Sequence, residues 1–312
     1  MKYVATGLNM LDVLEMPDGS RTKPQMGGIP MYGYCGMRPW SESILFSARV
    51  GKDFFSLYNP WFENNNIDPS GLNIVSEVTP YSILKYLDDS NYDIDRFFEG
   101  SWDDSDFWRP KAEDFIGKLD NTKGFYLTGG PPPEDIWNGL FDYRKKHGFK
   151  IMWEPNGRHT FPEDRGATID LCKRIDMASF NIVEGGRIFG INSEESLIEF
   201  LKNLGPELVL LRAGERGLYS ISEGEAWFIP STPLEDGVEV VDVTGCGNAA
   251  TAAACLAWAE GNNPVMTGIM ANISAYYNFQ QVGPWPLFDD GLMQHAESLA
   301  KKLYSSYTSK PV

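Results

Sequence analysis

Short apolar segments separated by longer amphipathic ones are the feature that most constrains how this chain of 312 residues can fold. Two of the longer stretches are typical of helices: residues 133–147, which end in His147-Gly148, and residues 193–204, which start at the potential cap Ser193. Strands that alternate with helices predict an α/β fold, a doubly wound and mostly parallel sheet flanked by helices. The strand-length apolar segments are residues 3–6, 43–46, 124–127, 150–153, 177–180 and 208–211.

Residues 79–88 interrupt this alternation, because apolar and polar residues follow one another there with the period of a strand that has one exposed face. Residues 88–108 then carry eight acidic residues interleaved with six aromatic ones. Two interpretations of this stretch stay open. It is either a solvated loop whose aromatic side chains pack inward, or a lid that closes over a substrate.

Charge and cysteine content exclude several classes of protein. A formal net charge of −16 works against binding to nucleic acid, which needs clustered Lys and Arg. The four cysteines lack the paired short spacings of a zinc site or a disulfide framework, which fits a reducing cytoplasm. No apolar run approaches the about 18 residues of a membrane span, and the N-terminus lacks the apolar stretch of a signal peptide. We therefore expect a cytoplasmic protein without nucleic-acid or membrane partners.

Residues 240–258 carry the most informative pattern, because a short apolar strand, a glycine-rich turn and an alanine-rich helix follow one another there. Gly245 and Gly247 allow the backbone to turn its N–H groups outward at the start of the helix, where unpaired donors and the helix dipole attract an anion. The pattern predicts an anion hole formed by Gly245, Cys246 and Gly247. A tight strand-to-helix turn that binds nothing needs the same glycines.

Residues 242–248 read Asp-Val-Thr-Gly-Cys-Gly-Asn and resemble the Asp-Thr-Thr-Gly-Ala-Gly-Asp motif of the ribokinase-like (PfkB-type) carbohydrate kinases, with four of seven positions identical. In that family the glycine turn holds the transferring phosphate, and the last Asp accepts the proton of the acceptor hydroxyl. The resemblance implies a single kinase domain over residues 1–312 with a small β lid at about residues 10–35 and 72–108. It also implies ATP-dependent transfer of phosphate to a hydroxymethyl group of a sugar or nucleoside.

Further motifs of the family follow in the expected order along nearly the whole chain, and two of them concern the acceptor. Gly27-Gly28 resembles the early Gly-Gly motif that approaches the sugar, and Asp12 stands where the family holds sugar hydroxyls. Tyr32 replaces an Asn that many members use to contact the sugar, which indicates a more aromatic pocket. Residues 50–54 resemble the Val-Gly-Asp-Asp signature that follows the next strand.

Other motifs concern the nucleotide and cations, so the resemblance implies ATP, Mg²⁺ and K⁺ as cofactors. Residues 181–184 fit the Asn-x-x-Glu motif for magnesium and phosphate, and residues 154–156 stand where members usually have Asp-Pro-Asn. Residues 212–217 resemble the turn beneath the nucleotide. The residues implied for nucleotide and magnesium are Asn181, Glu184, Arg212, Gly214, Gly217 and, in a later helix lining the adenine pocket, Asn272; those implied for a monovalent cation are Asp242 and Thr244.

Asn248 is the main departure from the family, because an amide does not accept a proton near neutral pH and can only orient the hydroxyl. Loss of a general base typically lowers a rate by about 10²–10⁴. Three functions therefore stay open: a kinase with an unusual or water-mediated base, an inactive relative that binds nucleotide or sugar as a sensor or partner subunit, and an enzyme that uses Cys246 as a nucleophile. By family analogy alone we expect a homodimer through the lid.

Overall fold

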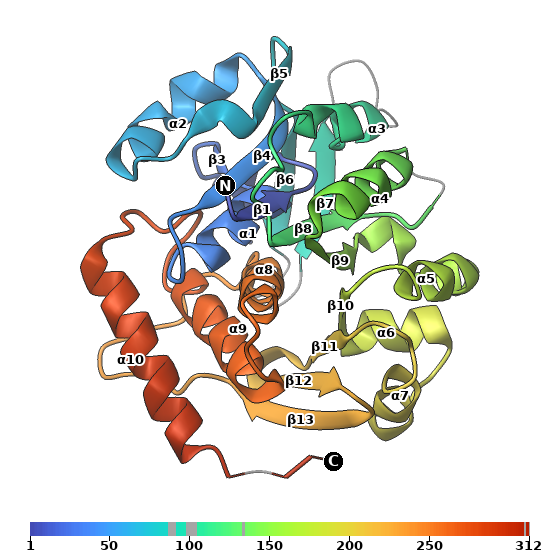
Figure 1. Cartoon of the computed structure of the whole chain (residues 1–312). Helices are drawn as coiled ribbons and strands as arrows, with labels where there is room; N and C mark the ends of the chain where they lie inside the picture. Colours follow the sequence, from blue (N-terminus) through green and yellow to red (C-terminus); the bar gives the residue numbers. More distant parts are fainter. Residues whose placement is uncertain (87–91, 98–104, 133–134, 309, 312) are drawn as a thin grey trace.

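The computed structural model places the six predicted apolar strands in one large sheet (Figure 1). It describes residues 1–86, 92–97, 105–132, 135–308 and 310–311. The nine strands of the sheet are, in spatial order, β13 (Glu225–Pro230), β12 (Gly217–Ser222), β11 (Leu208–Arg212), β10 (Met177–Asn181), β9 (Lys150–Pro155), β8 (Gly124–Gly129), β1 (Tyr3–Thr6), β4 (Ile44–Gly51) and β5 (Leu72–Ser76). Neighbours from β11 to β5 pair in parallel, whereas β12 and β13 form an antiparallel hairpin at one edge.

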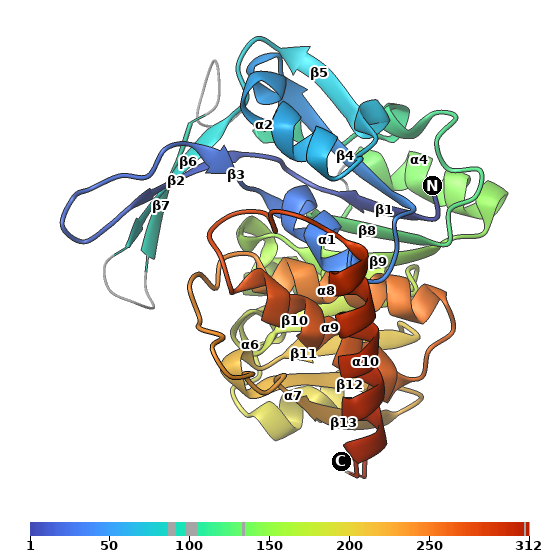
Figure 2. The same ribbon diagram turned by 90° about the vertical axis from the view of Figure 1, so that its left-hand side faces the viewer.

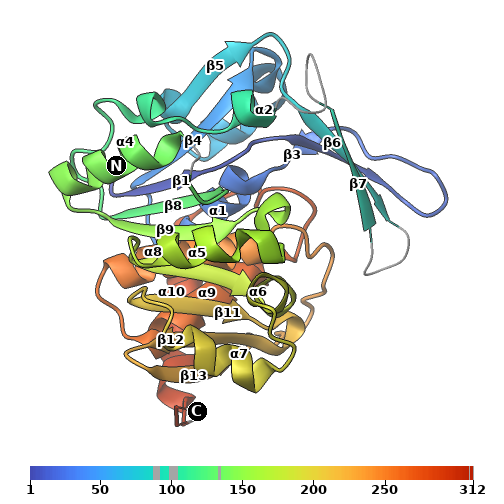
Figure 3. The same cartoon turned by 90° about the vertical axis from the view of Figure 1, so that its right-hand side faces the viewer.

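The central strands are buried on both faces because helices cover both faces of the sheet. Figure 2 looks onto the face covered by α1 (Ile29–Met37), α8 (Cys246–Ala259), α9 (Pro264–Asn278) and α10 (Asp290–Ser306), with α2 (Asp53–Asn64) over β4 and β5. Figure 3 shows α4 (Ile136–His147), α5 (Arg165–Cys172), α6 (Ile182–Phe189) and α7 (Glu194–Leu201) on the opposite face. The hydrophobic core therefore has two layers, one on each side of the sheet.

The remaining helical segments are short connections between these elements. They are α3 (Ser105–Trp108) and the 3-10 helices η1 (Pro69–Gly71), η2 (Ala112–Phe115), η3 (Gly157–His159), η4 (Pro162–Asp164) and η5 (Gly214–Arg216). Nowhere in the described ranges does a helix have both the length and the apolar character needed to cross a membrane.

Each of the two predicted helices has one end where a sequence signal places it. The Ser193 side chain accepts a hydrogen bond from the Ser196 backbone N–H at 3.3 Å and so caps α7, although this helix ends at Leu201, three residues before the predicted end. Gly148, with a left-handed φ of 77°, ends α4. Residues 133 and 134 of the predicted helix lie outside the described residues.

A second sheet of four strands projects beyond the first (Figures 2 and 3). Its order is β3 (Gln25–Met26), β2 (Leu11–Glu15), β6 (Tyr81–Tyr86) and β7 (Tyr92–Phe97), and β2 pairs in parallel with β6. We call these four strands the lid sheet. All four fall within the two segments that the resemblance assigns to a lid, whereas β5 and the start of α1, in the same segments, belong to the main body. Residues 88–91 and 98–104 of the acidic and aromatic stretch lie outside the described residues.

One predicted strand is wrong. Residues 240–243 are irregular, and the side chains of Val240, Val241 and Val243 are 55–59% exposed. The backbone N–H groups of Val241 and Asp242 both donate to the carbonyl oxygen of Phe279, at the end of α9, instead of to a neighbouring strand. Among the described residues this segment pairs with no strand of either sheet, and the end of α9 takes its backbone donors instead.

Candidate active site

Two side chains, Tyr32 and Arg212, lie directly against the backbone of the glycine turn at the N-terminus of α8. Gly245 has a left-handed φ of 78°, and a Cβ at this position would overlap the ring of Tyr32. A Cβ at Gly247 would overlap the guanidinium of Arg212, at its Nη1 atom. The absence of side chains at both glycines therefore allows an aromatic ring and a cation to lie directly on the turn where the unpaired N–H groups of α8 begin.

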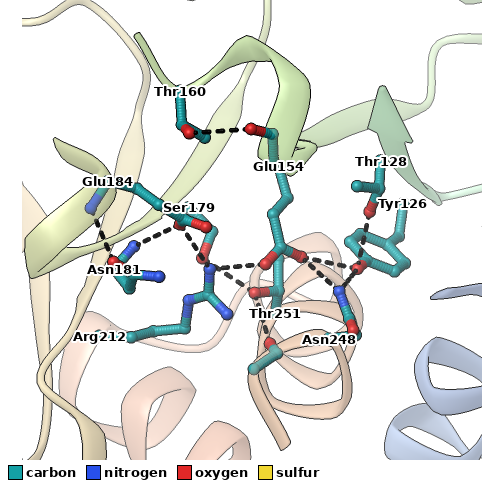
Figure 4. Close-up of polar contacts among 12 residues, drawn as sticks. Tyr126, Thr128, Glu154, Thr160, Ser179, Asn181, Glu184, Arg212, Asn248 and Thr251 are labelled. Atoms are coloured by element: carbon teal, nitrogen blue, oxygen red, sulfur yellow. Dashed lines mark hydrogen bonds and ion pairs between the residues drawn. The ribbon is translucent and has the colours of Figure 1, made fainter. Parts of the chain in front are cut away.

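Glu154, at the end of β9, joins Arg212 of β11 to Asn248 of α8 (Figure 4). Its Oε1 atom lies 2.6 Å from Arg212 Nη2, and its Oε2 atom accepts hydrogen bonds from the Tyr126 hydroxyl at 2.7 Å and from Asn248 Nδ2 at 3.2 Å. Asn248 Nδ2 also donates to the Tyr126 hydroxyl, at 3.1 Å. The amide at position 248 is thus a hydrogen-bond donor to a buried carboxylate, a role that an ionised aspartate cannot take.

Arg212 pairs with both acidic side chains of this network. Burial alone would lower the pKa of Arg212, but the charges of Glu154 and Glu184 raise it, so the guanidinium stays positive. Arg212 Nη2 lies 3.6 Å from Glu184 Oε2. Burial raises the pKa of the Glu184 carboxyl; the Arg212 charge opposes this rise and the Glu154 charge adds to it. One cation thus lies between a buried carboxylate, Glu154, and a half-buried one, Glu184.

Glu184 lies at this site because it belongs to the first turn of α6. The Asn181 side chain accepts from the Glu184 backbone N–H at 2.8 Å, and the Glu184 carboxylate accepts from the Asn181 backbone N–H at 3.2 Å. This reciprocal capping box fixes both side chains at the end of β10. No group of three or more His, Cys, Asp or Glu side chains among the described residues could hold a metal by itself. A divalent cation at Glu184 would need ligands from water and from a bound phosphate.

Asp12 stands on the lid sheet, at the other end of the site. It lies on β2 and is 9% exposed, and its Oδ1 accepts a hydrogen bond from the Ser82 hydroxyl of β6. A Cβ at Gly27 would overlap the Asp12 carboxylate, and one at Gly28 would lie 2.6 Å from the backbone nitrogen of Met10. Gly27 therefore allows the backbone before α1 to lie against Asp12 of the lid sheet, and Gly28 allows it to lie against the loop that precedes β2.

A cavity of about 710 Å³ joins these groups at the carboxyl ends of the parallel strands, where ligands bind in open α/β sheets. Its lining includes the predicted residues Asp12, Gly28, Tyr32, Asn181, Glu184, Arg212, Thr244, Gly245, Gly247 and Asn248. It also includes residues that the sequence did not suggest, among them Ser82, Leu84, Arg109, Thr128, Arg158 and Phe161. Strand-end position could have suggested Thr128, which lies at the end of β8, but nothing in the sequence shows that Arg109 lies near the same cavity.

Several predicted residues lie outside the lining of this cavity. The Asn272 side chain donates to the carbonyl oxygens of Ile229 and Pro230, at 3.1 and 2.9 Å, and so ties α9 to the end of β13. Gly214 and Gly217 form the turn from β11 into β12. Asp242 accepts from the backbone N–H of Thr244, a residue that does line the cavity. The assignment of these residues to a nucleotide or a cation stays a prediction.

Cys246 lacks the features of a nucleophile. Burial raises the pKa of its thiol to about 11, even though Asn278 donates a hydrogen bond to the sulfur. The thiol itself donates to the Ala275 carbonyl oxygen at 3.6 Å. Because the thiolate is the reactive form, this environment disfavours nucleophilic chemistry, and Cys246 packs as a small residue between α8 and α9.

Known proteins resemble this chain in sequence and in fold. A family model described as pfkB family carbohydrate kinase matches residues 20–286. An uncharacterized protein of Schizosaccharomyces pombe is 25% identical over 324 aligned positions, which cover 91% of this chain and 85% of that protein. An adenosine kinase from Sinorhizobium meliloti superposes with a TM-score of 0.74 at 15% identity, over 95% of this chain and 98% of that one.

A ribokinase from Arabidopsis thaliana, solved with ribose and ATP, superposes with a TM-score of 0.71 at 20% identity, over 96% of this chain and 98% of that one. At these identities the solved structures establish the fold alone, and they confirm the predicted ribokinase-like α/β architecture. The family model spans most of the chain, including most of the lid sheet and the glycine turn before α8. The chain therefore belongs to the pfkB family of carbohydrate kinases.

Proposed function

We propose that this protein transfers the γ-phosphate of ATP to a hydroxymethyl group of a sugar or nucleoside. The observation that carries this function is the position of the Arg212 guanidinium on Gly247, at the N-terminus of α8. Arg212 Nε has no hydrogen-bond partner among the described residues, although it is buried. A buried donor and a helix N-terminus that meet in one cavity suit a phosphate group.

At the nucleotide end, the backbone of residues 245–248 and Arg212 would stabilise the charge on the transferring phosphate. Glu184 is a carboxylate that lines the cavity, and the described residues contain no group of three or more side chains that could hold a metal ion. Glu184 would therefore hold Mg²⁺ through water molecules. When bound, Mg²⁺ would neutralise phosphate charge during transfer.

At the acceptor end, Asp12 offers a carboxylate to hydroxyl groups, and Tyr32 offers an aromatic edge beside the glycine turn. The two similar solved proteins named above are an adenosine kinase and a ribokinase with bound ribose. Their names support both acceptor classes and do not separate them. Asn248 would accept a hydrogen bond from the acceptor hydroxyl through its Oδ1 atom, because Nδ2 is already directed at Glu154 and Tyr126.

We extend the proposal to four further properties. Gly214, Gly217 and Asn272 would contact the nucleotide, and Asp242 with Thr244 would bind K⁺, both on the family resemblance alone. A cytoplasmic location is supported by the four cysteines, all of which are free. A homodimer through the lid sheet rests on family analogy and is open to measurement by light scattering.

A second candidate function is binding without turnover, as a sensor or partner subunit. The observation that favours it is the Asn248 amide itself, which cannot act as a general base. In this case the cavity would still bind ATP, because Arg212, Glu184 and the glycine turn do not depend on a base at position 248.

The test is transfer of labelled phosphate from Mg-ATP to a panel of sugars and nucleosides by the unmodified protein, Gly247→Ala and the control Gly166→Ala. Gly247 and Gly166 are both the second residue of a helix, but a Cβ at Gly247 overlaps Arg212, whereas one at Gly166 meets nothing within 4 Å. We expect transfer by the unmodified protein and by Gly166→Ala, and loss of transfer and of ATP affinity in Gly247→Ala. Equal activity in all three would exclude the glycine turn as the phosphate site. ATP binding without transfer to any acceptor would favour the second candidate.

A further inference from the structure

The carboxylate that the family places at position 248 is replaced here by an amide, yet a carboxylate lies one hydrogen bond away. Glu154 Oε2 is 3.2 Å from Asn248 Nδ2, and the Glu154 side chain is only 6% exposed. Both residues line the same cavity as the glycine turn.

The orientation of the Asn248 amide follows from its neighbours. A carboxylate only accepts hydrogen bonds, so the atom of Asn248 that faces Glu154 is the N–H₂ group. The same group donates to the Tyr126 hydroxyl, which in turn donates to Glu154. The Oδ1 atom of Asn248 remains as the acceptor for a group on the cavity side.

Tyr126 does not compete for a proton. Burial, and after it the charge of Glu154, raises the pKa of the Tyr126 hydroxyl well above its ordinary value, so the phenol stays neutral. Thr128 also donates to this hydroxyl, at 3.0 Å, so the Tyr126 oxygen accepts from Thr128 and Asn248 while its own proton points to Glu154. Tyr126 thereby fixes the carboxylate that receives the Asn248 hydrogen bond.

The other acidic side chains of the cavity are held elsewhere. Glu184 caps α6 through the Asn181 backbone, and Asp12 accepts from Ser82 on the lid sheet. The groups that face Glu154 are Arg212 from β11, Tyr126 from β8 and Asn248 from α8, with Glu184 of α6 across Arg212. Glu154 is therefore the carboxylate that contacts Asn248 directly.

We propose that Glu154 is the terminal proton acceptor of the reaction and receives the proton through the Asn248 amide; this inference rests on the proposed kinase function. As the acceptor oxygen forms its bond to the γ-phosphorus, its O–H bond breaks and the proton passes to Asn248 Oδ1. An Nδ2–H bond of Asn248 breaks at the same time, and that proton passes to Glu154 Oε2, which leaves the side chain of Asn248 as the imidic acid. The bond between the γ-phosphorus and the bridging oxygen breaks, and ADP leaves with the electron pair.

The side chains return to their starting state after transfer. Glu154 gives its proton back to Asn248 Nδ2, and Oδ1 releases a proton to solvent in the cavity. The sum over one turnover is the loss of the hydroxyl proton to solvent, as in a kinase with an aspartate base. In this scheme the proton acceptor is Glu154 on β9 instead of a carboxylate at position 248 on α8, and the Asn248 amide lies between it and the acceptor hydroxyl.

Exchanging the carboxylate and the amide tests this proposal, with steady-state kinetics measured for the unmodified protein, Glu154→Gln and the double variant Glu154→Gln/Asn248→Asp. We expect Glu154→Gln to lose about 10²–10⁴ in kcat with KM for ATP changed only a few-fold. The double variant should regain most of that loss, because the carboxylate then stands on α8 and the amide on β9. Melting temperature and ATP affinity of each variant check that the site is intact.

Three results would overturn the proposal. These are full kcat in Glu154→Gln, no recovery in the double variant although ATP still binds, and full kcat in Asn248→Ala, which leaves the Glu154–Arg212 pair in place. The second result would mean that Glu154 acts only by holding Arg212. Absence of transfer by the unmodified protein with any acceptor is a separate outcome, since it removes the proposed function itself.

Discussion

At the residue scale, Asn248 is matched to its surroundings, because its amide donates to both Glu154 and Tyr126. The glycine motif that contains Asn248 could be found from the sequence, since the need for glycine at a tight turn is local. Tyr126 could not, because its role depends on the parallel register of β8 and β9, which places Thr128 opposite Glu154. The contact of Arg212 with Glu154 likewise depends on the order of the strands in the sheet, because the two residues lie on β11 and β9.

Replacing Asn248 with aspartate should destabilise the protein at neutral pH. The Asn248→Asp variant would lose the donated hydrogen bonds and would place a second carboxylate against Glu154, which raises the pKa of the introduced carboxyl in the folded state. The folded protein then disfavours the ionised carboxyl. The loss of folding stability is therefore largest above that raised pKa and disappears below the ordinary pKa of Asp. We expect the free energy of unfolding to fall by about 1–3 kcal/mol at pH 7. Melting temperatures measured from about pH 3 to pH 8 follow the effect on both sides of the ordinary Asp pKa. Unchanged stability at pH 7 would show that the amide contacts contribute little.

Glu184→Gln should stabilise the protein while it weakens binding of Mg-ATP. Burial raises the pKa of Glu184, so the folded state disfavours its charge at neutral pH, and a neutral amide of equal length removes that penalty. The gain in folding stability should be present at pH 7. It should vanish as the pH falls below the ordinary pKa of Glu, where Glu184 is protonated in both the folded and the unfolded protein. Thermal unfolding with pH and calorimetric titration of Mg-ATP measure the two effects; a lower melting temperature at pH 7 would contradict the first.

At the scale of elements, local sequence signals predicted the six apolar strands of the main sheet and one end of each of the two predicted helices. These strands are nearly continuous apolar runs, and the helix signals are single residues. The local signals failed at residues 240–243, where an apolar run has no strand to pair with. The packing of α1 on α8 was also hidden. A Cβ at Gly36 of α1 would overlap the backbone carbonyl of Ala249, next to Asn248, so these helices are in backbone contact.

Gly36→Ala should push α8 away from α1 and so disturb Asn248. The obstructing atoms belong to the backbone and cannot change rotamer. We therefore expect the free energy of unfolding to fall by about 1–3 kcal/mol and phosphate transfer to be slower. Gly268→Ala in α9 is the matched control, because a Cβ there meets the Ile229 side chain, at 2.8 Å, which can change rotamer. Denaturant unfolding of both variants measures the difference, and an equal or smaller cost at Gly36 would contradict the close packing.

At the scale of the whole molecule, the α/β class followed from the alternation of elements, while the second sheet needed the family resemblance to be expected. β2 and β6 of the lid sheet are about 70 residues apart in the chain and pair in parallel, a contact that no local pattern encodes. The acidic composition has a global consequence as well, since a net charge of −16 repels itself in the compact state.

Salt should therefore stabilise the protein by screening, and the choice of cation separates screening from a specific site. We expect the melting temperature to rise between about 0.01 and 0.15 M salt, with a larger rise in KCl than in NaCl if Asp242 and Thr244 help to bind K⁺. If the melting temperature rises equally with KCl and with NaCl, screening explains the whole effect, and the result counts against a potassium site.

Phosphorus NMR of the unmodified protein with Mg-ATP and a mixture of sugars and nucleosides tests the central claim, that this chain is a working kinase. We expect ADP together with a new phosphomonoester resonance split by two methylene protons, as for a phosphorylated hydroxymethyl group. An unchanged ATP spectrum, under conditions where ATP is shown to bind, would contradict it and identify a protein that binds nucleotide without phosphorylating anything.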